Sequence, residues 1–219
     1  MRKELYLFID GKPQKAIIRH YNLADFEGLI HVQRLSFPPP YPQELWWNKD
    51  QLTEHVTRFP EGAICAEVDG SIIGSMTGLR IDMNEYGHDH NWETISDSGY
   101  IRNHKESGDT LYVIDLCVIP EYRKSGIGKW LMQSMYETVV QLGLLRLLGG
   151  GRMPGYGARS HQISPEEYLD KVMQGEWKDP VITFLLKCGR MPIGVAHNYL
   201  DDEQSHNCAA IMEWRNPFK

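Results

Sequence analysis

The stretch Pro120-Glu121-Tyr122-Arg123-Lys124-Ser125-Gly126-Ile127-Gly128-Lys129 decides the fold of this chain. It follows an apolar run at 111–119, typical of a strand buried on both faces, and precedes a helical apolar pattern at 128–142. Glycines let the main chain approach a bound group closely, and a helix start offers unpaired N–H donors at the positive end of its dipole. Three cationic side chains add positive charge: Arg123, Lys124 and Lys129. The stretch therefore predicts a pyrophosphate-binding loop.

Two other phosphate-binding motifs do not fit this loop. A P-loop requires a glycine five residues before Gly128 and Ser or Thr after the lysine, whereas Arg123 and Trp130 occupy those positions. A dinucleotide fingerprint requires a small residue three positions after its second glycine, where Leu131 stands. The remaining alternative is a glycine-rich turn that binds nothing, and the agreement of strand, loop, charge and helix disfavours it.

The lead-in Val118-Ile119-Pro120-Glu121-Tyr122-Arg123, followed by Gly126 and Gly128, resembles the GNAT superfamily of N-acetyltransferases. The resemblance implies acetyl-CoA as co-substrate. It also implies that the main chain at Leu116, Cys117 and Val118 pairs with the pantetheine arm like an added strand. The pyrophosphate would then bind the loop residues Arg123, Lys124, Ser125, Gly126, Ile127, Gly128 and Lys129.

The order of the expected elements agrees with the GNAT fold, an α/β (α+β) architecture with a mixed central sheet of about seven strands flanked by about four main helices. Apolar runs predict strands at 15–20, 63–68, 71–80, 111–119, 144–148, 191–196 and 209–214. Apolar stripes and caps predict helices at 23–35, 43–58, 128–142 and 179–188, with a short one starting at 164. Residues 1–13 read as a short leader of a single domain over 1–219, with a small strand at 5–9 and a turn at 10–13. Residues 82–109 read as a lid or elaborated loop.

A second group of motifs resembles one subgroup of the superfamily more closely. These are Gly150-Gly151-Arg152-Met153-Pro154-Gly155-Tyr156, Ser164-Pro165-Glu166-Glu167-Tyr168 and Asn198-Tyr199-Leu200. In that subgroup the acetyltransferase domain precedes a nitrilase-like carbon–nitrogen hydrolase. The chain carries none of the hydrolase residues, so the resemblance implies no hydrolase activity here. It leaves a carbon–nitrogen hydrolase open as a partner.

Composition narrows the classes of partner. The 219 residues include 23 Lys and Arg against 29 Asp and Glu, a net charge of −6, which argues against a general nucleic-acid binder. No apolar run is long enough to span a membrane. The four cysteines form no C-x-x-C pair, which favours buried thiols in a reducing, cytoplasmic compartment. A homodimer remains open.

The expected central strand at 111–119 contains a candidate for the general base of the expected reaction. Asp115 is a carboxylate in an otherwise apolar strand, where an unpaired charge is costly and a raised pKa is expected. It is therefore a candidate base, the alternative being a structural aspartate with a polar partner. Glu93 is a further candidate base, and Tyr112, three residues before Asp115, is a candidate for a substrate contact. Deprotonation of the amine through water needs no dedicated base.

The acid departs from the pattern of the superfamily. Members often carry a tyrosine four residues before the glycine that ends the helix at 179–188, here Gly189, but the position holds Leu185. Tyr156 and Tyr199, from the two subgroup segments, are the candidates that could replace its hydroxyl. For each of them structural packing is the alternative.

Two further features have weaker functional readings. His88-Asp89-His90 alternates histidines as a metal site does, but no matching ligands follow and a solvated loop is favoured, so no metal is expected. Trp46-Trp47 and Phe37-Pro38-Pro39-Pro40 suit either an acceptor pocket or plain core packing.

The sequence thus predicts an acetyl-CoA-dependent N-acetyltransferase acting on an amine of a small molecule or a peptide. The alternative is a non-catalytic acyl-CoA sensor, or a partner module of a carbon–nitrogen hydrolase, which the missing tyrosine favours.

Overall fold

The structure is a computed structural model that describes residues 1–87 and 90–219. Its centre is a mixed sheet with the order β1-β2-β3-β4-β5-β6-β9-β7, in which β8 pairs with β9. The strands are β1 (Arg2–Ile9), β2 (Lys12–His20), β3 (Ala63–Val68), β4 (Ser71–Ile81), β5 (Thr110–Val118), β6 (Arg146–Leu148), β7 (Gly150–Arg152), β8 (Met191–Ala196) and β9 (Ala209–Arg215). The expected GNAT fold class is confirmed, with two more strands than predicted.

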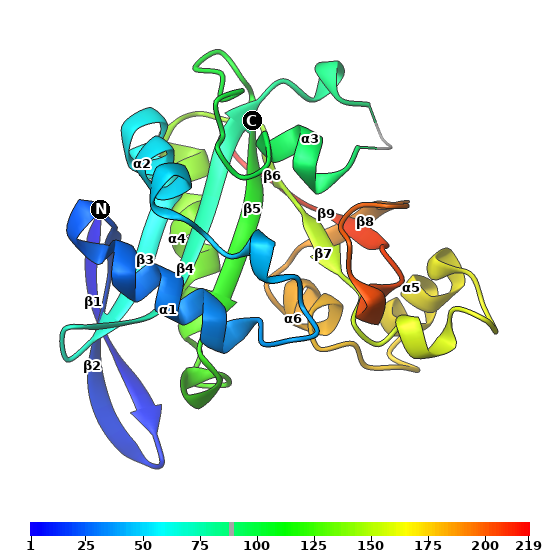
Figure 1. Ribbon diagram of the computed structural model, residues 1–219, viewed down its shortest axis with the longest axis horizontal. Helices are drawn as coiled ribbons and strands as arrows, with labels where there is room; N and C mark the ends of the chain where they lie inside the picture. Colours follow the sequence, from blue (N-terminus) through cyan, green and yellow to red (C-terminus); the bar gives the residue numbers. More distant parts are fainter. Residues whose placement is uncertain (88–89) are drawn as a thin grey trace.

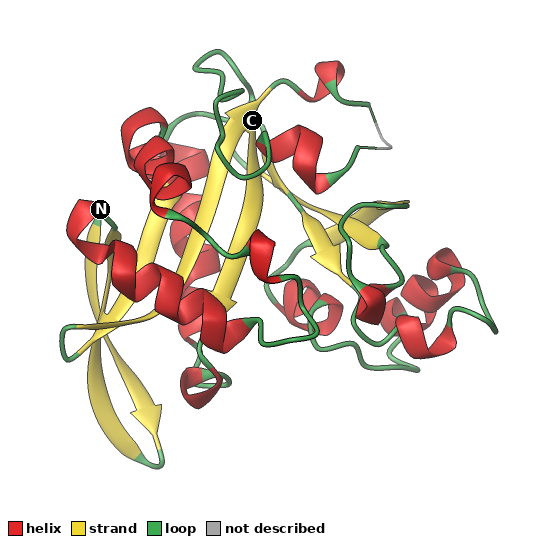
Figure 2. Cartoon of the chain, in the orientation of Figure 1, coloured by secondary structure: helices red, strands yellow, loops and turns green. Residues whose placement is uncertain are grey.

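The helices cover both faces of this sheet (Figures 1 and 2). They are α1 (Phe26–Ser36), α2 (Lys49–Arg58), α3 (Trp92–Ser96), α4 (Ile127–Gln141), α5 (Pro165–Met173) and α6 (Ile182–Lys187). Helices α1 and α4 both pack on β4 and β5, from opposite faces, as Figure 1 shows. The apolar side chains of β3, β4 and β5 are therefore buried on both faces of the sheet, which explains the nearly unbroken apolar run of β5.

Helix α4 has the amphipathic face that its sequence predicts. Leu131, Met135 and Thr138 are buried against the sheet, whereas Gln133 and Glu137 face solvent. Gly143, with a φ of +65°, follows the helix end in the left-handed conformation that a glycine favours. Because α4 is the next α-helix after β5 in the chain, its N-terminus lies near the end of β5.

The expected leader is wrong in its boundaries. Strand β1 begins at Arg2 and pairs with β2 along its whole length, so it is the edge strand of the main sheet. Leu7 is buried, and the Lys3 ammonium donates to Ser134 Oγ at 3.1 Å, which ties the strand to α4. The local sequence predicts the turn at Asp10-Gly11. It does not show the pairing with β2 and the contact with α4, with which β1 extends beyond the expected strand.

Three other boundaries differ from expectation. The helix expected at 43–58 is interrupted, because Trp46 is extended and Asn48 caps a new helix by accepting from Gln51 N. The segment expected as a loop at 82–109 contains α3, which begins after the cap Asn91. The glycine-dense segment at 149–157 contains the strand β7, because its main chain pairs with β9.

Candidate active site

Strands β5 and β6 pair only at one end. The parallel register runs from Thr110 opposite Arg146 to Tyr112 opposite Leu148. Strand β6 also pairs with β9 on its other side, and β7, which follows it, pairs with β9 but not with β5. Figure 1 shows β5 and the β6–β7 segment diverging from this shared end. A cavity of about 1090 Å³ lies there, bordered by Val113 to Val118 on one side and Gly149 to Arg152 on the other.

The open edge of β5 carries backbone groups without a strand partner. Ile119 N donates to Ile73 O at 3.0 Å on the β4 side, whereas Val118 O accepts from the Arg123 guanidinium at 3.1 Å. Because successive residues of a strand direct their backbone groups to opposite edges, those of Leu116 and Val118 point to the cavity and those of Cys117 to β4. This edge can accept an extended chain with amide groups, as the family resemblance implies.

A bulge reorients the middle of β5. Thr77 pairs with Asp115, but the next residue, Gly78, pairs with Val113, so Ile114 is the extra residue. Its carbonyl accepts from the Trp92 indole N–H at 2.9 Å, which holds the bulge from α3. A bulge changes the direction of the side chains around it, here that of Asp115.

The predicted pyrophosphate loop joins β5 to α4 at the other end of the cavity. Arg123, Lys124, Gly126, Gly128 and Lys129 border the cavity. Lys124 and Gly126 have φ values of +68° and +92°, which turn the chain sharply before the helix. Among the described residues, no carboxylate pairs with the three cations. The loop thus joins free positive charge to a helix N-terminus.

Three of the predicted loop residues have structural contacts of their own. The Arg123 guanidinium donates to Val118 O and, at 2.9 Å, to Ser36 O, so it fastens the loop to β5 and α1. Ser125 Oγ accepts from Ile127 N at 3.3 Å, and Ile127 is buried in the core. Neither Ser125 nor Ile127 borders the cavity, so any contact of theirs to a ligand would come from the main chain.

Asp115 borders the cavity, but its Oδ2 is shielded from solvent and has no hydrogen-bond partner. Burial raises the pKa of its carboxyl to about 7, and the side chains of Cys117 and Gln33 offset only part of that rise. Gln33 is itself fixed, because its Oε1 accepts from Trp47 N at 2.6 Å. A carboxyl with this pKa exchanges a proton near neutral pH.

Tyr199 borders the same cavity and belongs to a chain of polar groups. Its hydroxyl lies 3.1 Å from that of Tyr112, which in turn lies 2.7 Å from His90 Nε2. Burial raises the pKa of Tyr199 to about 12, so its hydroxyl holds its proton at neutral pH. Gly150 leaves the space for this ring, since a Cβ at that position would lie 2.3 Å from Tyr199 Cζ.

The structure does not bring Tyr156 into this cavity. Its hydroxyl donates to Ile163 O at 3.2 Å, and its ring packs against Tyr168 with centroids 5.5 Å apart. Glu93, on the exposed side of α3, also lies outside the cavity lining. Of the catalytic candidates in the sequence, the cavity therefore gathers Asp115 and Tyr199.

The acceptor-side candidates divide in the same way. Phe37, the three prolines that follow it and Trp47 border the cavity, whereas the Trp46 indole donates outside it to Phe37 O at 3.0 Å. Trp47 is also buried in the core, so both readings of this aromatic segment hold.

Two arginines of the cavity were not predicted as site residues. Arg152 donates twice to Asp202, at 2.7 Å each, and its guanidinium lies 5.1 Å from the centre of the Tyr41 ring. Arg190 is 2% exposed and has no carboxylate partner among the described residues. The only signal in the sequence was the position of Arg152 within the glycine-dense segment.

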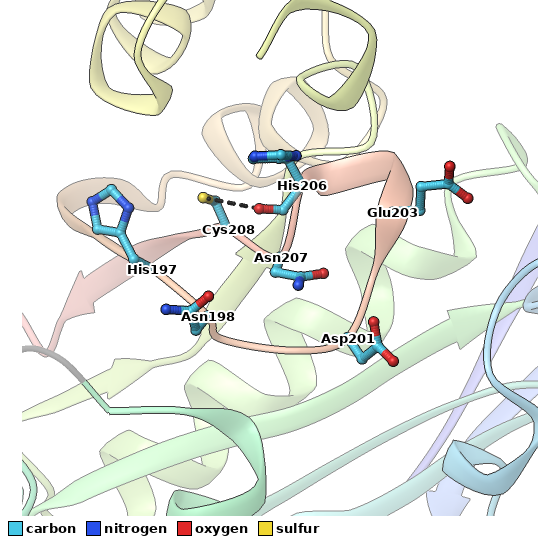
Figure 3. A pocket seen from close by; sticks show the side chains of 7 residues that line it. All are labelled: His197, Asn198, Asp201, Glu203, His206, Asn207 and Cys208. Atoms are coloured by element: carbon cyan, nitrogen blue, oxygen red, sulfur yellow. Dashed lines mark hydrogen bonds between the residues drawn. The ribbon is translucent and has the colours of Figure 1, made fainter. Parts of the chain in front are cut away.

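A second pocket, of about 460 Å³, is lined by residues of the segment that joins β8 to β9 (Figure 3). Its polar groups include His197, Asp201, His206 and Cys208, whose Sγ donates to His206 O at 3.3 Å. Within residues 1–87 and 90–219 no group of three His, Cys, Asp or Glu side chains is placed to hold a metal ion. Of the predicted His88-Asp89-His90 feature, the first two residues lie outside the described part.

The sequence comparison identifies the family. A model of the acetyltransferase (GNAT) family matches residues 26–159, which include the open strand edge and the loop. The chain belongs to the GNAT acetyltransferase family. The resemblance seen in the sequence is thereby confirmed, and this GNAT protein is an acyltransferase.

The chain is similar to two proteins from Bacillus subtilis (strain 168). The GNAT protein is 50% identical over 216 residues to the uncharacterized N-acetyltransferase YkwB, covering 99% of this chain and 96% of that protein. It is 36% identical over 204 residues to the probable hydrolase YhcX. That alignment covers 93% of this chain but 39% of YhcX, so the similarity is to one part of a longer protein.

Solved structures agree on the fold. The GNAT-like decarboxylase GphF in complex with isobutyryl-CoA has a TM-score of 0.76 at 23% identity, covering 90% of this chain and 98% of that one. The loading GNATL domain of CurA from Lyngbya majuscula has a TM-score of 0.75 at 18% identity, covering 91% and 97%. At these identities the likeness concerns the fold alone.

Two observations bear on the predicted cell compartment. Within the described residues no helix is long and apolar enough to cross a membrane. The four cysteines are free thiols, and Cys65, Cys117 and Cys208 are buried. The cytoplasmic location stays a prediction.

Proposed function

We propose that this GNAT protein transfers an acetyl group from acetyl-CoA to an amine of a small molecule or a peptide. The observation that carries the proposal is that Asp115, Tyr199 and the cations of the loop border one cavity. Within residues 1–87 and 90–219, Asp115 Oδ2 has no hydrogen-bond partner and no carboxylate pairs with those cations. The similarity to YkwB, an uncharacterized N-acetyltransferase, supports the same class of reaction.

The residues that would hold the co-substrate fit its chemistry. The pyrophosphate suits the loop amides and the cations Lys124 and Lys129, because a helix N-terminus and fixed positive charge both favour a bound anion. The amide-containing arm suits the open edge at Leu116 and Val118. Acetyl-CoA supplies an activated thioester carbonyl, and the remaining requirements fall to side chains of the cavity.

Asp115 takes the proton from the incoming ammonium in this proposal. Its pKa of about 7 leaves a large fraction ionised at neutral pH, and its carboxyl group borders the cavity, where it can accept a hydrogen bond from the amine. Such a base contributes about a hundredfold or more to a rate.

Tyr199 donates the proton to the leaving thiolate in this proposal. Its burial keeps the hydroxyl protonated, and Tyr112 with His90 fixes the direction of the hydroxyl. Leu185, at the position where the superfamily often has a tyrosine, borders the same cavity and has no polar group. Tyr199 is thus the hydroxyl that would serve in its place.

A second candidate function is an acyl-CoA-binding module that senses acetyl-CoA or acts beside a carbon–nitrogen hydrolase. The similarity to part of the probable hydrolase YhcX favours it. In either case we propose that residues 1–219 form one domain, since β1 and β9 both belong to the central sheet.

Two measurements on the same protein separate the candidates. Thermal unfolding with acetyl-CoA reports binding, and release of free thiol across a panel of amines reports turnover. We expect an increase in Tm and turnover with at least one amine. An increase in Tm without turnover on any amine would favour the sensor, and no increase would contradict both functions.

A further inference from the structure

Arg190 is a buried cation without a carboxylate partner. Its side chain is 2% exposed, and its Nη2 donates to the carbonyl oxygens of Gly149, at 3.3 Å, and Met212. Its Nε is buried and has no hydrogen-bond partner. The groups that act on its charge are hydroxyls and a thiol, from Tyr136, Tyr112, Tyr199 and Cys188, all neutral at physiological pH. Within the described residues, the positive charge of Arg190 is therefore balanced by two carbonyl oxygens and by no carboxylate.

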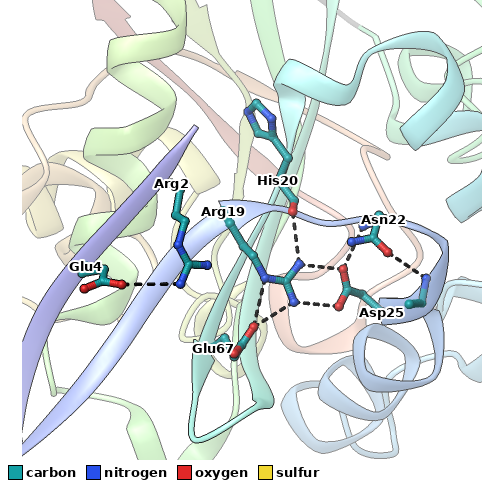
Figure 4. Close-up of polar contacts among 8 residues, drawn as sticks. Arg2, Glu4, Arg19, His20, Asn22, Asp25 and Glu67 are labelled. Carbon is teal, nitrogen blue, oxygen red and sulfur yellow. Dashed lines mark hydrogen bonds and ion pairs between the residues drawn. The ribbon is translucent and has the colours of Figure 1, made fainter.

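Among the described residues, four half-buried arginines have a carboxylate partner, one of them Arg80, 3.6 Å from Glu106. Of the other three, Arg19 binds both Asp25 and Glu67 (Figure 4), Arg146 binds Glu213, and Arg152 binds Asp202. Each of those three is more exposed than Arg190. A fifth half-buried arginine, Arg159, donates to Gly155 O instead. Arg190 is the most deeply buried arginine of the described residues, and no carboxylate among them pairs with it.

Burial lowers the pKa of Arg190 to about 10, which still leaves the guanidinium charged at neutral pH. A buried charge without a partner is costly, and neutral carbonyls offset only part of that cost. An anion that enters the cavity would offset the rest. Arg190 borders the cavity, so its guanidinium can donate to an anion bound there.

The guanidinium lies at the inner end of the cavity. A Cβ added at Gly149 would meet Val113 O at 2.8 Å and Arg190 Nη2 at 3.2 Å, so Arg190 lies beside the point where β5 and β6 begin to separate. The loop Arg123–Gly128 lies at the opposite end of β5. A ligand bound to the loop by its pyrophosphate therefore extends its reacting end towards Arg190.

We propose that Arg190 binds a carboxylate of the substrate at the inner end of this cavity. The carboxylate belongs either to the acyl group of the CoA thioester or to an acceptor that carries both an amine and a carboxylate. The inference rests on the proposed function, because the loop sets the direction in which the thioester lies. It adds a class of substrate that the loop and Asp115 do not specify.

The donor source is tested by binding of CoA thioesters to the full-length protein, measured by calorimetry. Succinyl-CoA and malonyl-CoA are compared with the uncharged butyryl-CoA and acetyl-CoA. If the acyl group carries the carboxylate, we expect about a tenfold to hundredfold tighter binding of the charged member of each pair.

The acceptor source is tested with acetyl-CoA as donor. Thiol release is measured with 4-aminobutyrate and with butylamine, which differ in the carboxylate. If the acceptor carries it, we expect KM for 4-aminobutyrate to be lower by about the same factor.

The variant Arg190→Met removes the guanidinium and its charge and keeps an unbranched apolar side chain. We expect it to abolish the preference for the carboxylate while acetyl-CoA still binds, and Arg190→Lys to restore part of it. The control Arg34→Met removes an exposed arginine outside the cavity lining and should leave the preference unchanged. If Arg190→Met fails to fold, the comparisons on the unmodified protein decide alone.

The outcomes separate the two proposals. Binding of acetyl-CoA and acetylation of an amine, without preference for a carboxylate on either side, would overturn the role of Arg190 and leave the proposed function standing. A preference that persists in Arg190→Met would also overturn it. Failure of every thioester to bind would contradict both.

Discussion

The hydroxyl of Tyr199 lies 3.1 Å from the hydroxyl of Tyr112, although 87 residues separate them in the chain. Tyr112 comes from the last part of β5 that still pairs with β6, and Tyr199 comes from the segment between β8 and β9. The contact therefore joins the two halves of the molecule at the inner end of the cavity. His90, 2.7 Å from Tyr112, completes the chain of polar groups.

Tyr199→Phe removes the hydroxyl that we assign as the acid. We expect kcat to fall by about a hundredfold or more while binding of acetyl-CoA is unchanged, because the ring still fills the space beside Gly150. Steady-state thiol release and thermal unfolding with acetyl-CoA measure the two quantities. A kcat within about twofold of the unmodified protein would exclude Tyr199 as the acid.

Tyr156→Phe tests the other tyrosine predicted from the sequence. Its hydroxyl donates to Ile163 O and lies outside the cavity lining. We expect a loss of about 1 kcal/mol in the free energy of unfolding and little change in kcat. A large loss of kcat with normal binding of acetyl-CoA would show that the cavity does not contain the whole active site.

Asp115→Asn removes the base in our proposal. In the unmodified protein we expect the rate to rise with pH through about 7, where the Asp115 carboxyl loses its proton, and then to stay level. Tyr199 adds no descending limb near neutral pH, because its pKa is about 12. The variant should lose this rise together with most of its kcat. A rise that survives in Asp115→Asn would assign the base to another group or to water.

The same residue predicts how stability depends on pH. The pKa of Asp115 is raised in the folded state, so between about pH 4 and 7 the folded chain keeps a proton that the unfolded chain releases. Its contribution to stability therefore falls as the pH rises through this window. At pH 8 we expect Asp115→Asn to be more stable than the unmodified protein by about 1–3 kcal/mol, and at pH 4 to be equal. Urea unfolding at both pH values measures the difference, and a less stable variant at pH 8 would contradict the raised pKa.

Gly126→Trp places an indole at the loop. No atom lies within 4 Å of a Cβ built there, so the new side chain extends into the space that the pyrophosphate would occupy. We expect binding of acetyl-CoA to be lost, with about 1 kcal/mol of strain because φ is +92°. Gly128→Trp should also lose binding, but it meets the Phe184 ring at 3.3 Å as well.

Gly70→Trp is the matched control for Gly126→Trp. Gly70 has a φ of +79° and no atom within 4 Å of a built Cβ, but it lies in the turn between β3 and β4, outside the cavity lining. It should show a similar strain with normal binding, measured by thermal unfolding with and without acetyl-CoA. Normal binding by Gly126→Trp would place the pyrophosphate elsewhere.

Arg19→Met leaves the carboxylates of Asp25 and Glu67 without their shared partner (Figure 4). Burial tends to raise the pKa of Asp25, but hydrogen bonds from Arg19 and from Asn22 N outweigh it and the pKa is lowered. The stability that this pair contributes is present above about pH 4 and is lost as the pH falls. We expect the variant to lose about 1–3 kcal/mol at pH 7 and less at pH 3, measured by urea unfolding.

Arg2→Met is the control for Arg19→Met. The Arg2–Glu4 pair on β1 is exposed, with N and O 3.4 Å apart, and should contribute nothing measurable. An equal loss in both variants would mean that burial does not strengthen the Arg19 cluster.

Much of the donor side was predictable because its signals are local. A strand, a glycine turn and a helix cap each depend on residues within a few positions, so the loop Arg123–Gly128 and α4 were located from the sequence. The side chain of Ile127 faces the core and that of Ser125 lies outside the cavity lining, so the prediction for these two residues concerns their main-chain amides. The ligand contacts of the whole loop stay predictions.

The catalytic side was only partly predictable. Asp115 could be identified because a carboxylate within an apolar strand is unusual in any fold. Tyr156 and Tyr199 were equivalent in the sequence, since both lie in segments without regular structure. Only the packing of Tyr199 against Gly150, and of Tyr156 against Tyr168, separated them.

The sequence alone determined the family, the fold class and the strand–loop–helix unit that would bind the donor, because these depend on short-range patterns. The tertiary structure decided that β5 and β6 separate after Tyr112, and that Asp115, Tyr199 and Arg190 border one cavity. It also decided which charges have partners: Arg19 has two carboxylates and Arg190 has none. The physical reason is that burial and pairing depend on contacts between residues far apart in the chain, which a motif does not record.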